Sequence, residues 1–246
     1  LGPMIRSLFI PEKGCTWGCF DYSQQEPRLV AHYALRYGLP SVNTIADSYD
    51  TDSSTDFHKI VAEMAEIPRE QAKVINLGLF YGMGKAKLQA ELGVTKYKAE
   101  ELFEKYHSRV PFVKQLMNEV MKAGAKKGQI KTLLGRRCRF PKYEPILRGS
   151  DWGKYIPPED EERMQDLQKM GPYIKDDEGE TLKDKDGNPK KNYWHNNPTR
   201  RAFTYKALNK LIQGSAADMT KKAMLELYKE GITPHIQVHD ELDISV

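Results

Sequence analysis

The sequence predicts an α+β fold, in which short antiparallel strands near the two ends of the chain enclose a longer helical middle. Two observations lead to this prediction. Residues 5–20 and 236–246 combine short apolar or alternating runs with turn residues, as the strands of hairpins do. Several segments between them place apolar residues three or four positions apart, which is the period of an amphipathic helix. A chain of 246 residues, 39% of them hydrophobic, can form one large domain or two modest ones.

Composition narrows the range of partners. The formal net charge of +4 permits a nucleic-acid partner but does not argue for one, because the local distribution of charge matters more. The three sparse cysteines imply no disulfide framework. No apolar run is long enough to cross a membrane and no signal peptide is visible, so we expect no membrane partner. Leu1 stands where a Met would start, and Val246 lies inside an alternating strand, so we expect a piece of a longer protein.

The N-terminal region is predicted to contain a hairpin, a helix and a loop. Residues 5–20 are interpreted as two short strands around a turn at Pro11–Gly14. Apolar residues at helical spacing predict a helix over residues 26–37. Residues 41–55 are rich in Ser, Thr and Asp, which predicts a loop.

Helix-start signals mark the middle of the chain. Asp56 is a suitable N-cap, and Pro68 and Pro111 stand where proline favours the first turn of a helix. Glycines around Tyr81 interrupt the helical pattern, which resumes at Thr199. These signals predict helices over residues 56–66, 68–81, 96–107, 111–127 and 199–230.

Two further hairpins and an insertion complete the predicted elements. Residues 129–140 predict a hairpin with a basic turn, and residues 236–246 predict one with His239 and Asp240 at its tip. Residues 143–199 are rich in charge, Pro, Gly and Asn. We interpret this segment as an inserted, surface-exposed subdomain.

One face of the helix that begins after Pro68 has a four-residue repeat, formed by Arg69, Lys73, Leu77 and Tyr81. Residues at this spacing lie along one slowly turning face. Two neighbouring cations repel one another on a bare helix, and an anionic ligand such as a triphosphate removes that cost. Taken alone, the same row is more typical of a solvated basic edge beside a half-buried tyrosine, because two basic residues and a tyrosine are a common combination.

Two acidic residues, Asp21 and Asp240, are far apart in the sequence, yet each is expected at the end of a strand or in a turn. Carboxylates from separate strands can hold two Mg²⁺ ions that clamp an in-line phosphoryl displacement. Unrelated turn aspartates are the alternative, because Asp is common in turns. His239 and Glu241 flank Asp240, but a zinc site would need more His or Cys at ligand spacing. The common glycine-rich nucleotide loops are absent from the sequence.

Taken together, these segments resemble DNA polymerase family A, the family of bacterial DNA polymerase I and many phage replicases. The motifs occur in the family's order, and the resemblance covers nearly the whole chain outside residues 143–199. The first palm motif is matched by DYSQQEPR at 21–28, the fingers helix by the Arg69–Tyr81 repeat, and the last palm motif by QVHDE at 237–241. Further matches are MIRSLF at 4–9, DFHKIVAEM at 56–64, GRR at 135–137 and NKLIQGSAAD at 209–218.

The resemblance implies a polymerase right hand, with a palm built on an antiparallel sheet and with helical fingers. Residues 1–36 and 200–246 would form the palm, residues 37–142 the fingers, and residues 143–199 a charged insertion near the fingers. In this expectation the second part of the palm is truncated. A thumb, with or without an exonuclease domain, would precede this chain in the intact protein.

The resemblance also implies roles for individual residues. The implied metal ligands are Asp21, the carbonyl group of Tyr22 and Asp240, with two Mg²⁺ ions that Mn²⁺ can replace. The implied catalytic set is Asp21, Lys73, Asp240 and Glu241. The implied dNTP-binding set is Glu26, His58, Arg69, Lys73, Leu77 and Tyr81. The implied DNA-binding set is Arg28, Tyr81, Asn209, Gln213 and His239. Within the dNTP-binding set, the Glu26 side chain would act as a steric gate against a ribose 2′-hydroxyl group.

The sequence departs from the family pattern at three positions. Leu77 stands where Phe or Tyr is usual, Pro27 replaces the usual Leu, and Tyr205 stands where an Arg often occurs. The side chain at position 77 touches the incoming sugar in the family. We therefore expect altered discrimination against dideoxynucleotides.

The implied activity is that of a DNA-directed DNA polymerase, which transfers dNTPs to a primer 3′-hydroxyl group along a template by a two-metal mechanism. The expected location is the cytoplasm, that of the host cell for a phage gene. Two alternatives stay open. A single-subunit RNA polymerase shares the fingers spacing, although the gate at Glu26 argues against it. An inactive or truncated fragment would bind nucleic acid without chemistry, so the activity of this chain by itself is left open.

Overall fold

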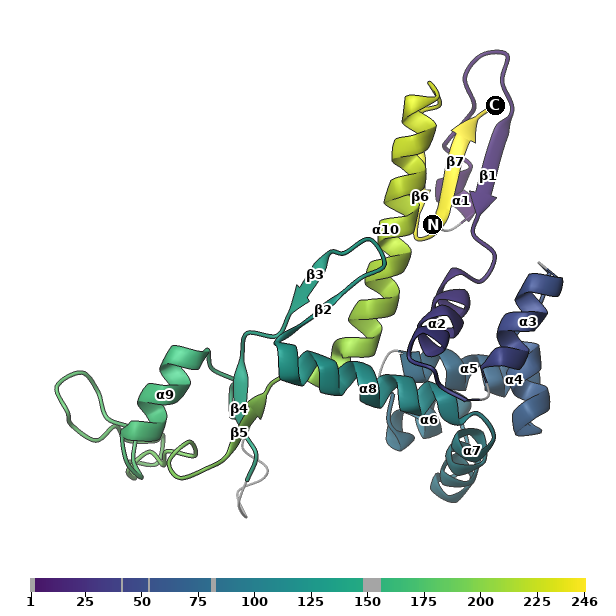
Figure 1. Ribbon diagram of the computed structural model, residues 1–246. Coiled ribbons are helices and arrows are strands. Elements are labelled where there is room, and N and C mark those ends of the chain that lie inside the picture. The colour runs from purple at the N-terminus through teal and green to yellow at the C-terminus, as the bar shows by residue number, and fades with distance from the viewer. Residues whose placement is uncertain (1–2, 41, 53, 81–82, 148–155) are drawn as a thin grey trace. The chain divides into compact units, whose positions relative to one another are not determined.

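The computed structural model describes residues 3–40, 42–52, 54–80, 83–147 and 156–246. The chain divides into two compact units (Figure 1). Unit 1 comprises Leu1–Val120, Lys131–Cys138 and Tyr205–Val246. Unit 2 comprises Met121–Ile130 and Arg139–Thr204. Each unit therefore combines segments that are distant in the sequence.

A three-stranded antiparallel sheet in unit 1 joins the two ends of the chain (Figure 1). Its strands are β1 (Trp17–Asp21), β6 (Ile236–Val238) and β7 (Glu241–Ser245), in the order β1-β7-β6. The β6–β7 hairpin turns through His239 and Asp240, as the sequence predicts. Leu242, Asp243 and Ile244 of β7 are all buried, and the two apolar side chains share one face of the strand, which favours the register in which β1 pairs with it.

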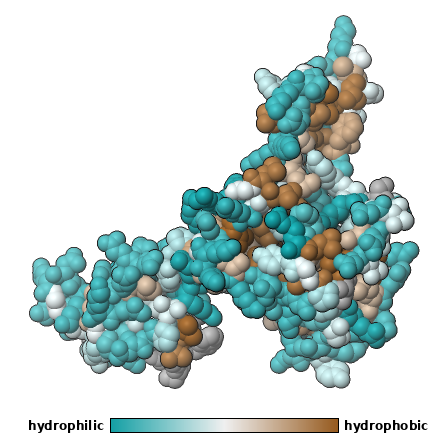
Figure 2. Space-filling view, viewed as in Figure 1, coloured by the Kyte–Doolittle hydropathy of each residue, from teal (hydrophilic) through white to brown (hydrophobic). Residues whose placement is uncertain are grey.

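The predicted hairpin over residues 5–20 is wrong in its first arm. Residues Pro3–Arg6 form a short helix, α1, and the described residues contain one strand, β1, in this region. The predicted turn is present, with Gly14 at a φ of 91°. The partner of β1 is β7 at the far end of the chain, and the apolar residues that suggested the first arm stay exposed. Figure 2 shows hydrophobic surface in this region, to which Met4, Ile5, Leu8, Phe9, Ile10 and Phe20 contribute exposed side chains.

Helices form most of unit 1 (Figure 1). They are α2 (Gln25–Arg36), α3 (Asn43–Thr51), α4 (Phe57–Ala65), α5 (Arg69–Phe80), α6 (Lys85–Leu92), α7 (Lys96–Arg109), the first part of α8 (Pro111–Lys127) and α10 (Ala207–Lys229). The helices predicted at 26–37, 56–66, 68–81, 96–107 and 111–127 are confirmed. The N-cap prediction is confirmed too, because the Asp56 carboxylate accepts hydrogen bonds from the backbone N–H groups of His58 and Lys59. No helix in the described part of the chain has the length and apolar character that crossing a membrane requires.

Two other predictions fail, and one helix was not predicted. Residues 41–55 contain the helix α3 rather than a loop, because Val42 and Ile45 are fully buried and anchor it. Its hydroxyl groups bond back to the helix, as in the 2.7 Å contact from Ser48 Oγ to the Thr44 carbonyl oxygen. The helix α6 was not predicted. The helix expected from residue 199 begins at Ala207, after the strand β5 (Thr199–Arg201).

The predicted hairpin at 129–140 is present as β2 (Gln129–Lys131) and β3 (Arg137–Arg139), with its turn at Gly135. Its tip packs against α10. The Arg136 side chain binds Asp218 Oδ1 and the Gly214 carbonyl oxygen, both at 2.8 Å, and the Thr132 hydroxyl group donates to Asp218. A Cβ atom at Gly214 would lie 2.8 Å from Thr132 Cγ2, so the close approach requires glycine.

The helical part of unit 1 contains a buried titratable side chain. His107 on α7 is 9% exposed, and its Nδ1 has no hydrogen-bond partner among the described residues. Its ring contacts Phe103 and Tyr106 edge to face. Burial, with a smaller contribution from the charge of Lys114, lowers the pKa of His107 to about 4.

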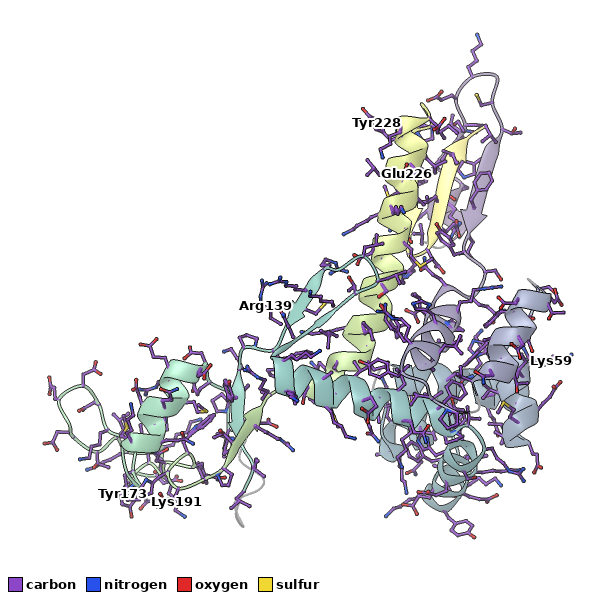
Figure 3. All side chains as sticks on the ribbon, in the orientation of Figure 1. Lys59, Arg139, Tyr173, Lys191, Glu226 and Tyr228 are labelled. Carbon is purple, nitrogen blue, oxygen red and sulfur yellow. The ribbon has the colours of Figure 1, made fainter. Side chains whose placement is uncertain are left out.

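Unit 2 has its own small core. It contains the two-stranded sheet of β4 (Tyr143–Pro145) and β5, and the helix α9 (Glu161–Lys169). Met164, Leu167 and Trp194 are buried together. The predicted turn at Asp186–Gly187 is confirmed, with Gly187 at a φ of 82°. Tyr173 and Lys191 pair as an isolated bridge and lie side by side in Figure 3.

The first prediction concerns the close approach at Gly214. An Ala in a helix is ordinarily more stable than Gly by about 1 kcal/mol. Here we expect Gly214→Ala to lower the free energy of unfolding by about 1–3 kcal/mol, because the new methyl group overlaps Thr132 Cγ2. Urea unfolding measures the change. Adding Thr132→Ser removes that methyl group, keeps the hydroxyl group and should restore most of the loss; a double variant no more stable than Gly214→Ala contradicts the packing account.

The second prediction concerns pH. The pKa of His107 is lower in the folded chain than in the unfolded chain, so the unfolded chain takes up this proton first as the pH falls. The stability that depends on neutral His107 is therefore complete above about pH 6.5 and is lost progressively towards pH 4. We expect a loss of about 2 kcal/mol from this group between about pH 7.5 and pH 5.

Urea unfolding of wild type and His107→Gln at both pH values isolates this contribution. The variant lacks the titrating ring, so its stability should change less with pH by about the same 2 kcal/mol. Equal losses in the two proteins would show that His107 does not carry the effect.

Candidate active site

Acidic side chains from the two ends of the chain meet at one end of the β1-β7-β6 sheet. Asp21 is the last residue of β1 and is paired with Glu241, the first residue of β7. Asp240 lies in the turn before Glu241, and the backbone N–H of Tyr22 donates to its carbonyl oxygen at 3.4 Å. The register of two strands therefore brings together three carboxylates that the sequence separates by most of its length.

The charges of this acidic cluster act on one another. Burial raises the pKa of Asp21 most, and the negative charges of Asp240 and Glu241 raise it further. Arg6 of α1 binds both carboxylate oxygens of Glu241, with Nη2 at 3.1 Å from Oε2, and this hydrogen bond holds the Glu241 pKa below its usual range. The Glu241 carboxylate is thus paired with the guanidinium group of Arg6. The repulsion between Asp21 and its acidic neighbours would be relieved by a bound cation.

Two sets of residues have the chemistry to hold a metal. Asp21 and Asp240 offer carboxylate oxygens, the ligands that Mg²⁺ prefers, and the backbone of Tyr22 contacts Asp240 through its N–H group. Cys19, Glu241 and Asp243 place ligand atoms within 4.8 Å of one another on β1 and β7. A thiol group is a poor ligand for Mg²⁺, and Glu241 is already bound by Arg6. The first set therefore fits magnesium better.

A cavity of about 460 Å³ lies beside the acidic cluster in unit 1. It is lined by Gln24, Gln25, Glu26, Pro27, His58, Leu77, Gln213, Ala216, Ala217, His239 and Asp240. Residues from the segments 21–28 and 237–241 and from α5 therefore share one cavity, although they are distant in the sequence. Its lining combines three carboxamides, two carboxylates and two imidazoles with small apolar side chains, which suits a polar ligand with a flat apolar part.

Arg69 and Lys73 lie on α5, but they do not line this cavity. Arg69 is bound by two carboxylates, Asp56 and Glu70, at 2.8 and 2.9 Å. The Asp56 hydrogen bond raises the Arg69 pKa. Lys73 is exposed, and its charge lowers the pKa of His58, which places the two side chains near one another. The cations predicted to bind phosphates therefore lie around His58, a residue of the cavity lining.

Arg28 and Asn209 lie outside the cavity lining as well. The Arg28 guanidinium group stacks on the Tyr49 ring at 4.2 Å, and its Nε donates to the Ser23 carbonyl oxygen at 2.9 Å. Asn209 is partly exposed on α10, one turn before Gln213. Tyr81, predicted to contact both nucleotide and DNA, lies outside the described residues.

Gln24 is a cavity residue that the sequence analysis did not single out. Its φ of 53° starts α2 with a left-handed residue. Its carboxamide donates to the Thr55 carbonyl oxygen at 2.6 Å and accepts from the Phe57 backbone N–H at 2.8 Å. Gln24 thereby fixes the start of α4, and so His58, to the start of α2.

Gln25, Ala216 and Ala217 were missed as well. Two signals could have found them: Gln25 directly precedes Glu26, and Ala216 and Ala217 follow Gln213 by three and four residues on the same helix.

With this geometry established, comparison with known proteins identifies the family. The sequence matches DNA polymerase family A over residues 1–246. The chain belongs to this family. A family A fold agrees with the predicted combination of an antiparallel sheet and a helical region, and the chain has a solved structural neighbour with a TM-score of 0.62.

The individual relatives are polymerases of phages and bacteria. The chain is 32% identical to a DNA-directed DNA polymerase of Pseudomonas phage M6, covering 99% of this chain and 35% of that protein. It is 28% identical to the thermostable DNA polymerase I of Thermus aquaticus, covering 98% of this chain and 24% of that protein.

The structural neighbour is the POL domain of Pol1 from M. smegmatis, in complex with DNA primer-template and dNTP. It is 25% identical over 98% of this chain and 35% of that one. The chain thus spans about a third or less of the length of these family A relatives.

Proposed function

We propose that this chain carries the nucleotidyl-transfer site of a template-directed DNA polymerase, which joins dNTPs to a primer 3′-hydroxyl group. The observation that supports this most is the meeting of Asp21 and Asp240 at one end of the sheet, beside a cavity with polar walls. Membership of family A, the phage and bacterial relatives and the neighbour in complex with primer-template and dNTP point the same way.

In this proposal Asp21, Asp240 and the Tyr22 carbonyl oxygen hold two Mg²⁺ ions, which Mn²⁺ can replace. The ions would supply Lewis acidity at the 3′-hydroxyl group and at the phosphates. The contribution of the protein is to hold the carboxylates in fixed positions, which the register of β1 with β7 sets. Glu241 belongs to the catalytic set as the neighbour whose charge Arg6 offsets.

The dNTP would occupy the cavity. Glu26 in the first turn of α2 would block a ribose 2′-hydroxyl group, and Leu77 on α5 would contact the sugar. Arg69, Lys73 and His58 would bind the triphosphate, and Lys73 could protonate the leaving pyrophosphate. Tyr81 would stack at the templating position. Discrimination between bases would come from movement of α5 over the paired nucleotide.

Primer–template DNA would lie against Arg28, Asn209, Gln213 and His239. Gln213 and His239 line the cavity, so a nucleotide there and a primer end beside it would share these side chains. We assign residues 1–36 and 200–246 to a palm, 37–142 to fingers and 143–199 to an insertion. A thumb, with or without an exonuclease domain, would complete the hand in the intact protein. The phage relatives support a host-cell cytoplasmic site of action.

The third prediction tests the metal-binding carboxylates. Asp240→Asn should lower Mg²⁺-dependent primer extension by about a thousandfold or more, because it removes an anionic ligand where several kcal/mol of charge stabilisation arise. The protein expressed from the complete reading frame is assayed with a radiolabelled primer. Asp50→Asn is the matched control: it removes an exposed carboxylate on α3, a helix that contributes no residue to the acidic cluster or to the cavity lining, and should leave extension near the wild-type rate.

Two other outcomes identify the alternatives. Equal primer–template binding by both variants and by wild type, with no extension by any, assigns the chain to nucleic-acid binding alone. Extension with rNTPs at the rate seen with dNTPs assigns it to a single-subunit RNA polymerase. Equal extension by wild type and Asp240→Asn would overturn the metal assignment.

The fourth prediction concerns Leu77. A Tyr here carries a hydroxyl group that can replace the missing 3′-hydroxyl group of a dideoxynucleotide as a hydrogen-bond donor, whereas a Phe cannot. We expect Leu77→Tyr to raise the ratio of ddNTP to dNTP incorporation about tenfold above that of Leu77→Phe, the value of one hydrogen bond. Competitive single-nucleotide incorporation measures the ratio. Identical ratios in wild type and both variants would remove Leu77 from the sugar contact.

A further inference from the structure

Three helices of unit 1 contribute to a buried chain of hydrogen bonds that ends at the cavity. The Tyr106 hydroxyl group on α7 donates to Asn76 Oδ1 on α5. Asn76 Nδ2 lies 3.0 Å from His58 Nδ1 on α4. Tyr106 and Asn76 are fully buried and His58 is 8% exposed, while Lys59 beside it is exposed (Figure 3).

Burial of these polar groups requires an explanation. An amide or hydroxyl group buried among apolar side chains costs free energy unless its hydrogen bonds are satisfied, and apolar residues of similar size would pack at no such cost. Asn76 directly precedes Leu77, which lines the cavity, and His58 lines it as well. The chain of hydrogen bonds therefore connects the interior of the helices to the wall of the proposed dNTP site.

The direction of the hydrogen bonds determines the state of the His58 ring. A phenol that donates to Oδ1 orients the Asn76 carboxamide so that its N–H groups face His58. An amide N–H can only donate, so His58 Nδ1 must accept and carry no proton. In a neutral imidazole the proton then resides on Nε2. In a protonated ring the Nδ1–H group of His58 would face an N–H group of Asn76, and these two donors would repel one another.

The surrounding charges agree with a neutral ring. Burial lowers the pKa of His58 most, and the charges of Arg69 and Lys73 on α5 lower it further. Asp56, the N-cap residue of α4, and Glu70 on α5 act in the opposite direction. At neutral pH the lowering contributions prevail, since the pKa lies below its ordinary value.

We propose that Asn76 and Tyr106 are positioning residues that hold His58 as the neutral Nε2–H tautomer, a fixed hydrogen-bond donor for a phosphate oxygen of the incoming nucleotide. The inference rests on the proposed function for the identity of the ligand. Arg69 and Lys73 already supply positive charge near His58, so a neutral donor adds direction without a further charge. No covalent step is assigned to His58.

The fifth prediction reads the tautomer directly. In ¹⁵N-labelled wild-type chain, NMR correlation of ring nitrogens with ring carbon-bound protons should show His58 protonated on Nε2 and not on Nδ1 at pH 7, with the signal assigned by its loss in His58→Gln. Asn76→Asp replaces the donor by an isosteric acceptor. The carboxylate should draw the proton to Nδ1 and raise the His58 pKa above its ordinary value.

Controls separate this effect from general damage. Tyr106→Phe frees the Asn76 carboxamide to turn and should give a mixture of His58 tautomers. The His32 signals, from α2, should not change in either variant, because no contact joins that ring to Asn76 or Tyr106 among the described residues. Protonation of wild-type His58 on Nδ1, or a charged ring at pH 7, would overturn the proposal, as would an unchanged tautomer in Asn76→Asp.

A second readout links the tautomer to the ligand. In Asn76→Asp the neutral ring would present a lone pair to the phosphate, so the KM for dNTP should rise about tenfold as the pH rises through the raised pKa, while that of wild type stays flat over the same range. A merely structural role of Asn76 would not change this pH profile, so parallel profiles would refute the positioning role. If His58 shows the expected tautomers but the protein performs no DNA synthesis, the proposed function is wrong and the assignment of the ring proton stands. If the protein synthesises DNA but His58 is protonated on Nδ1, the proposed function stands and the tautomer assignment is wrong.

Discussion

The structure depends on the register between β1 and β7. This pairing sets Asp21 opposite Glu241 and brings the Asp240 turn against Tyr22. A slip of one residue would turn Leu242 and Ile244 to the other face of the sheet and would move Glu241 from its place opposite Asp21. The register that stabilises the sheet thus also fixes the spacing of like charges, whose mutual repulsion a bound cation can offset. Arg6 offsets one of these charges, and the proposed Mg²⁺ ions would offset the others.

A second constraint places the part of the cavity wall that α10 forms. Within about one turn of α10, Gly214 admits the β2–β3 tip, Ser215 accepts the backbone N–H of Leu133 at 3.0 Å, and Asp218 binds Arg136. The Ser215 hydroxyl group also bonds to that of Tyr33 on α2 at 2.8 Å. One helical turn therefore ties a hairpin and another helix together, and the residues between these anchors, Ala216 and Ala217, line the cavity. Small side chains are needed there because larger ones would fill the space left for a ligand.

The elements that sequence predicts well are those whose signals are local. The helix α5 begins directly after Pro68, α8 begins at Pro111, and α4 follows an N-cap aspartate, so their starts are encoded within a few residues. The helix α3 was missed because its stability comes from burial of Val42 and Ile45 rather than from its polar composition. Likewise, Glu26 and Leu77 were found through the motifs, whereas Gln24 and Asn76 act through partners on other helices, which periodicity cannot reveal.

The Arg69 ion pairs show how such a site can stay ordered before a ligand binds. Asp56 Oδ1 accepts the N-cap hydrogen bonds of α4, while Oδ2 binds the Arg69 side chain at 2.8 Å. The two oxygens therefore serve two separate structures. An incoming phosphate can replace Oδ2 as the partner of Arg69 and leave the cap of α4, and with it the position of His58, intact. Arg69 is 45% exposed, so releasing its ion pair to solvent costs little. A charge-assisted contact with phosphate can offset that cost, so the carboxylate holds the cation in place without competing strongly for it.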